Sequence, residues 1–176
     1  MNRCACLLPL LFGLMAGCSN AAPRLAIDLN VEQLWSHTQC GFVEKSARVI
    51  DNEHVFRQTY FQLGQHLLVG NAIDKSQLND LPQVDWSNKI VLLLAMGQKP
   101  SAGYAVSLAK SKSLVNNNVL SIEVNWQQPA ADSFQAQVIT SPCLLLAVPR
   151  HGYRSISVVD HSESLIQRWT VLPAPL

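Results

Sequence analysis

Alternation of apolar and polar residues dominates this chain and predicts that most of it folds into β-strands. At 122–126, Ile, Val and Trp alternate with Glu and Asn, as in a strand that buries one face. The same period predicts strands at 104–109 and 153–159, the second after a turn at His151-Gly152. Asn116-Asn117-Asn118 predicts a tight turn because Asn tolerates positive φ. We therefore expect 104–109 and 122–126 to form a hairpin.

Two continuous apolar runs predict strands that are buried on both faces. One spans 89–96, and the other spans 143–148 between Pro142 and Pro149. Weaker patterns predict further strands at 42–50, 135–139 and 165–172. The polar segment 70–88 is predicted as a loop with one helical turn near 76–81, and the mixed pattern of 25–35 leaves its state open.

One amphipathic helix is predicted between Asp51 or Asn52, either of which can cap its start, and Gly64, which suits the left-handed position after a helix. Residues at steps of three and four form its core-facing stripe: Val55, Phe56, Thr59, Tyr60 and Leu63. Such a stripe requires a sheet to cover. The chain is therefore predicted to be α+β and mostly antiparallel β, with one helix packed on a β-sheet or sandwich.

The first residues form a different apolar pattern, which is typical of export. Arg3 precedes an apolar run, and Ala16-Gly17 supplies small residues before Cys18. The pattern resembles a bacterial lipoprotein signal, which implies that residues 1–17 are removed and that Cys18 is lipidated. A membrane-spanning helix would need roughly 20 apolar residues, more than this run provides. A plain secretory signal with an unmodified Cys18 stays open as the alternative.

Lipoprotein sorting habits turn this pattern into a location. Ser19 after the cysteine points to the outer membrane, so we expect a lipid-anchored protein of the cell envelope that faces the periplasm. Residues 18–24 have the small, polar composition of a tether, and 25–176 fit a single globular domain. Lys and Arg number 13 against 12 Asp and Glu, so the balanced charge disfavours nucleic-acid binding.

Two cysteines, Cys40 and Cys143, remain in the expected mature domain. An oxidising compartment favours one disulfide between them. Closing a loop of this length would stabilise the fold by roughly 4 to 5 kcal/mol in the chain-entropy model. Two buried thiols that never meet are the alternative, and the sequence leaves both open.

The middle of the chain contains a less generic order of residues. Val84-Asp85-Trp86 precedes the buried strand, Met96-Gly97-Gln98-Lys99-Pro100-Ser101-Ala102-Gly103-Tyr104 follows it, and Thr140-Ser141-Pro142 precedes the second apolar run. This order resembles the PrcB family over 84–160, with Ser101 and Ala102 in place of Thr and Gly. The resemblance implies a non-catalytic accessory subunit that supports a partner protein, with a protease as the candidate partner.

The loop in this motif is the candidate partner-binding site. Its candidate residues are Gly97, Lys99, Pro100, Ser101, Gly103 and Tyr104. Pro and Gly at these positions also suit a plain connection between two strands, which is the simpler interpretation. The loop further resembles the Asn-Pro-Thr-Thr-Gly-Tyr loop of chagasin-type protease inhibitors, which implies an alternative function as an inhibitor presenting 97–104.

Catalytic and metal-binding motifs are missing from the sequence. It has no Gly-x-Ser-x-Gly elbow, no His-Glu-x-x-His and no Cys-x-x-Cys. Asp160-His161-Ser162 is interpreted as a polar turn, because neighbours in an extended chain point to different sides. We expect no enzymatic activity, no cofactor and no metal site. An enzyme would require a concave pocket that gathers a His with an acid or a hydroxyl, whereas an accessory protein would expose an apolar or loop surface.

Overall fold

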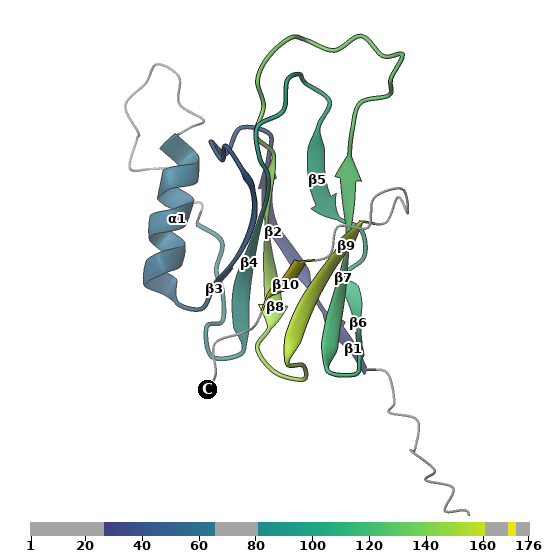
Figure 1. The fold of residues 1–176 in the computed structure, drawn as a ribbon. Coiled ribbons are helices and arrows are strands. Elements are labelled where there is room, and N and C mark those ends of the chain that lie inside the picture. The colour runs from purple at the N-terminus through teal and green to yellow at the C-terminus, as the bar shows by residue number, and fades with distance from the viewer. Residues whose placement is uncertain (1–26, 66–80, 161–168, 172–176) are drawn as a thin grey trace, which may run out of the picture.

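A computed structural model describes residues 27–65, 81–160 and 169–171. The described residues form ten strands in two sheets and one helix, arranged in three layers (Figure 1). The expectation of a mostly antiparallel β fold with one helix is confirmed. The signal segment 1–17, Cys18, the tether and residues 76–80 of the predicted turn near 76–81 lie outside the described residues. Within these residues, every helix is too short or too polar to span a membrane.

The central layer, which we call the helix-side sheet, is built on the two apolar runs. Its strands lie in the order β2 (Glu32–His37), β8 (Cys143–Pro149), β4 (Lys89–Met96) and β3 (Lys45–Ile50), all antiparallel. Both faces of β4 and β8 are covered, so nearly every residue in them is buried, as predicted. Leu92, Leu94 and Leu146 face the second sheet, while Leu93 and Leu145 face the helix.

The second layer, which we call the outer sheet, contains six strands: β1 (Ile27–Asn30), β6 (Lys112–Asn116), β7 (Val119–Gln127), β9 (Ser155–Asp160) and β10 (Trp169–Val171) in that order, with β5 (Ala105–Leu108) also paired to β7. The β7–β9 pair is parallel and the others are antiparallel. Alternate residues of this sheet, such as Leu120, Ile122 and Ile156, fill the core between the two sheets.

The predicted hairpin is only partly right. Asn117 and Asn118 do form a tight turn with positive φ, but it joins β6 to β7. The predicted pairing itself is confirmed, because β5 runs antiparallel to the second half of β7, with Leu108 opposite Val124. β5 and β6 therefore follow one another along the same edge of β7. The sequence pattern did not predict β6 as a separate strand.

The sequence pattern left the conformation of segment 25–35 undecided. Its described residues contribute to two strands, one in each sheet. β1 belongs to the outer sheet and β2 to the helix-side sheet, and the chain passes between them at the fully buried Val31. The predicted strand at 135–139 is wrong, because these residues form an irregular loop. The predicted strand at 165–172 is observed as the short β10, and the rest of that range is outside the described residues.

The helix α1 (Glu53–Gln65) packs on the free face of the helix-side sheet. Asn52 caps it, since its Oδ1 accepts a hydrogen bond of 3.0 Å from the N–H of Val55. Phe56, Thr59 and Leu63 are buried as predicted, whereas Val55 is exposed. The predicted role of Gly64 is wrong, because this glycine lies inside the helix and does not have a positive φ.

Replacing Gly64 with alanine should therefore stabilise the protein. A Cβ there would meet no atom within 4 Å, and alanine loses less backbone entropy in a helix than glycine does. We expect Gly64→Ala to raise the free energy of unfolding by about 0.5 to 1 kcal/mol in urea titrations. A decrease would contradict the helical conformation, because it would indicate a left-handed residue.

Candidate functional site

Three loops meet at one end of the two sheets, and we call this region the loop end: residues 38–44, 97–104 and 128–142. They connect β2 to β3, β4 to β5, and β7 to β8. Figure 1 shows the last two loops projecting beyond the strands, at the end opposite to the start of β1. The candidate loop 97–104 is thus one of three neighbours.

Backbone hydrogen bonds join the candidate loop to the loop on either side of it. Lys99 and Thr140 exchange N–H···O bonds of 2.8 and 3.0 Å, and the N–H of Ala102 donates to Ala136 O at 3.0 Å. On the other side, the N–H of Gln98 donates to Val43 O, also at 3.0 Å. The candidate loop is therefore held in the middle of the loop end.

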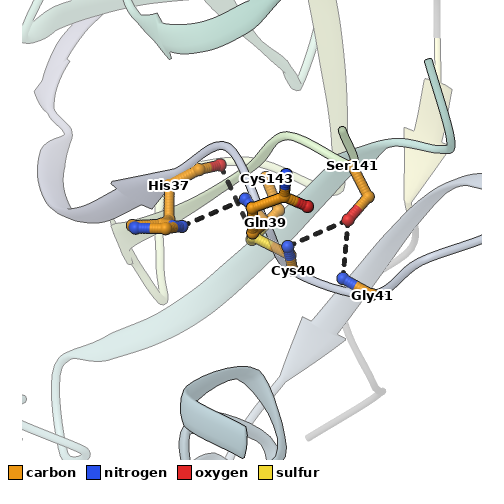
Figure 2. Close-up of a disulfide and its surroundings, with 6 residues drawn as sticks. All are labelled: His37, Gln39, Cys40, Gly41, Ser141 and Cys143. Atoms are coloured by element: carbon orange, nitrogen blue, oxygen red, sulfur yellow. Dashed lines mark hydrogen bonds between the residues drawn. A yellow bond between two sulfur atoms is a disulfide. The ribbon is translucent and has the colours of Figure 1, made fainter. Parts of the chain in front are cut away.

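A disulfide fixes the base of the loop end (Figure 2). The Cys40 and Cys143 sulfur atoms are 2.09 Å apart, so the structure has the disulfide rather than two separate thiols. Beside it, Ser141 Oγ accepts hydrogen bonds from the N–H groups of Cys40 and Gly41, at 3.0 and 2.6 Å. The loop 38–44 is thereby attached to the start of β8 by a covalent bond and by hydrogen bonds.

Two of the predicted site residues set the shape of the candidate loop. Gly97 and Gly103 have φ values of +73° and +90°. A Cβ on Gly97 would lie 2.7 Å from Lys45 N, so this position needs glycine for space as well as for conformation. Ala102, in contrast, does not have a positive φ and fits its position.

The other predicted site residues divide into structural and accessible ones. Tyr104 packs against the core between the sheets, and the carbonyl of Ser101 accepts a hydrogen bond of 3.0 Å from Thr140 Oγ1. Pro100 is exposed. Lys99 is partly exposed, with its Nζ 5.7 Å from the centre of the Tyr104 ring. Of the six predicted residues, only Pro100 and Lys99 therefore have accessible side chains that are not needed for the shape of the loop. These two side chains are the ones that a partner could contact.

The acidic-aromatic pair ahead of β4 has a structural role. The Asp85 carboxylate accepts hydrogen bonds from Asn88 Nδ2 at 2.8 Å and from the N–H of Ser87 at 3.1 Å. The bond from Asn88 is the main reason that the pKa of Asp85 is lowered. The Trp86 ring lies 5.4 Å from the Phe56 ring of α1. This pair orders the approach to β4 and packs the helix.

Exposed apolar side chains gather at the loop end, and the sequence analysis missed them. Four large side chains there are substantially exposed: Phe134 (104%), Val43 (69%), Ile139 (63%) and Val138 (45%). Val138 and Ile139 lie in the segment 135–139, which the sequence pattern assigned to a strand, and Phe134 directly precedes it. No local signal identifies them, because only the tertiary arrangement brings Val43 beside the other loops.

Positive charge lies next to these apolar side chains. Lys45 Nζ is 5.2 Å from the centre of the Trp126 ring, and Trp126 packs against the same core as Tyr104. Partial burial, followed by the positive charge of Lys99, lowers the pKa of Lys45. Lys45 and Lys99 thus each place an ammonium group over an aromatic ring that packs on the core between the sheets.

Two features of the described residues bear on catalysis and metal binding. A pocket between α1 and loop 38–44 includes the Thr59 hydroxyl but no His and no acid among its lining residues. The described His, Cys, Asp and Glu side chains form no group of three that could hold a metal ion. Asp160 is nearly buried and accepts a weak hydrogen bond of 3.4 Å from the N–H of Trp126. His161 and Ser162 lie outside the described residues.

Comparison with known proteins gives one match, which covers the centre of this arrangement. Residues 90–149 match the family model described as PrcB C-terminal. This match spans about a third of the chain, so it shows that this segment is similar to the PrcB C-terminal family. No curated protein and no solved structure matches the chain. The PrcB match includes β4 to β8 and two loops of the loop end, whereas Cys40 and the loop 38–44 lie outside it.

Removing the disulfide should destabilise the fold strongly. The bond closes a loop with a sequence separation of 103, so we expect Cys40→Ala/Cys143→Ala to lose about 3 to 5 kcal/mol of unfolding free energy. Urea titration of the variant, beside wild type with and without reductant, would measure this loss. An unchanged midpoint, or two titratable thiols in the native domain, would contradict the disulfide.

Gly97→Ala should have the opposite effect to Gly64→Ala. Positive φ and the short approach to Lys45 N both oppose a side chain at Gly97, so we expect a loss of about 1 to 3 kcal/mol. Amide exchange at Gln98, which donates to Val43 O, should accelerate. A neutral substitution with unchanged exchange would show that loops 38–44 and 97–104 are not held together in this way.

Proposed function

We propose that this protein is a non-catalytic accessory subunit of a protease complex, and that it binds its partner protein through the loop end. The observation that carries this proposal is the cluster of exposed apolar side chains on hydrogen-bonded loops. An apolar surface of this kind on a soluble domain marks an interaction site more often than chance exposure. The match of residues 90–149 to the PrcB C-terminal family model supports the association with a protease complex.

The ordered backbone of the loop end supports binding rather than accidental exposure. Phe134 and Ile139 are exposed although their loop is bonded to 97–104 at Lys99 and Ala102. A surface held in place before binding loses less conformational entropy on docking than a free loop does. The disulfide and the Ser141 hydrogen bonds contribute to the same order at the base of the loops.

Anchoring at Cys18 is the second part of the proposal. Residues 18–26 would reach at most about 30 Å when fully extended, so the start of β1 would stay near the outer membrane. β1 and β2 then run towards the loop end, over roughly 30 Å of strand. The loop end lies opposite the start of β1 (Figure 1), so it would face away from the membrane, into the periplasm, where a partner can reach it.

Site-specific photocrosslinking in intact cells tests the docking role. A photoreactive amino acid at exposed Pro100 should give one defined protein adduct, identified as a protease or a protein bound to one. The matched control is exposed His151, in a turn at the opposite end, which should give no such adduct. An adduct from His151 alone, or none from Pro100, would contradict docking at the loop end.

Two further measurements separate this proposal from its alternatives. Stoichiometric inhibition of a papain-type protease by the purified domain would favour the chagasin-like inhibitor instead. Metabolic labelling with palmitate should mark wild type but not Cys18→Ala, and equal labelling of both would reject the anchor while leaving the docking role open to the crosslinking test.

A further inference from the structure

The loop end has a chemical pattern that specifies its partner more closely. The candidate loop carries Lys99 in the middle, with Val43 on the loop bonded to Gln98 and Ile139 next to the bridged Thr140. Val43 and Ile139 are exposed, and the Lys99 ammonium group lies over the Tyr104 ring. Across the three loops, the order is therefore apolar, cationic, apolar.

We propose that the loop end binds an extended segment of the partner protein in which one Asp or Glu side chain lies between two aliphatic side chains on the same face. The acid would contact Lys99, and the aliphatic side chains would cover Val43 and Ile139. This inference rests on the proposed docking function and adds the chemistry of the partner.

Electrostatics favours an acid at the centre of this site. A carboxylate beside the Lys99 ammonium group gains a charge–charge attraction that a neutral side chain lacks. Lys99 forms no ion pair with any acidic residue in the part of the chain that the structure describes. The Tyr104 ring lies beneath the Lys99 ammonium group, and the Trp126 ring lies beneath that of Lys45. These contacts hold the ammonium groups at the surface and limit the number of lysine side-chain conformations from which binding must select.

The spacing of the loops suits an extended segment. Segments joined by backbone hydrogen bonds lie about 5 Å apart, so the three loops span roughly 10 Å. Alternate residues of an extended chain lie on one face at intervals of about 6.5 Å. The length of an extended segment with alternate aliphatic, acidic and aliphatic residues is thus comparable to the distance across the loops that carry Val43, Lys99 and Ile139.

A lipid surface is a less suitable occupant. The start of β1, where a membrane-tethered chain would enter the fold, is at the opposite end from these loops. Binding to anionic vesicles is therefore kept as an outcome that would count against the proposal.

Peptide titration followed by amide NMR tests the recognition directly. The probes are Ser-Leu-Ser-Glu-Ser-Leu-Ser and its variants with Gln or Lys in place of Glu, with phosphatidylglycerol vesicles as a separate arm. We expect the Glu peptide to shift the amides of Gln98 and Lys99, with affinity about three- to tenfold above the Gln peptide and higher still above the Lys peptide. Its binding should weaken as salt screens the charges.

The matched variants are Lys99→Gln and Lys112→Gln, two neutralised lysines on different surfaces of the fold. Lys99→Gln should remove the preference for Glu over Gln, whereas Lys112→Gln on β6 should keep it, and the amide spectra verify that both fold. Equal binding of all three peptides, no binding up to about 5 mM, or binding to the vesicles instead would overturn the proposal. Loss of peptide binding with the Pro100 adduct retained would reject this recognition mode and leave the docking function intact.

Discussion

Burial of β4 and β8 on both faces is the constraint on which the rest of the structure depends. The two strands are adjacent, and apolar residues occupy almost every position in them. Water must therefore be excluded from both sides of the helix-side sheet, and one covering layer would not be enough. The helix covers one face and the outer sheet covers the other, which produces the three layers.

The loop end follows from the same constraint. β4 ends at Met96 and β8 begins at Cys143, so the segments next to these buried strands emerge at one end of the fold. Loop 97–104 continues from β4, loop 128–142 leads into β8, and the disulfide attaches loop 38–44 to the first residue of β8. The candidate site is therefore placed by the most buried strands of the protein, although its own side chains are exposed.

Sequence analysis predicted the parts of the fold that depend on local pattern. The bounds of β4 are as predicted, and the cap at Asn52 and the turn at Asn117-Asn118 are also confirmed. It failed where the outcome depends on distant residues. The connection between β5 and β7, for example, contains the additional strand β6, and Gly64 remains helical although glycine so often ends a helix. The exposed apolar side chains of the loop end were missed for the same reason. The sequence pattern at 135–139 is the same whether this segment pairs as a β-strand or forms an irregular loop.

The passage of the chain from β1 into β2 at Val31 has a mechanical consequence. In a protein held at its amino terminus and by a partner at the loop end, tension would enter at Ile27 and travel along these strands to Cys40. Their hydrogen bonds to β6 and β8 would be loaded in shear, all together, instead of opening one after another. The disulfide would then pass the load to β8, so this path would resist pulling without relying on the helix or on the strands at the other edges of the sheets.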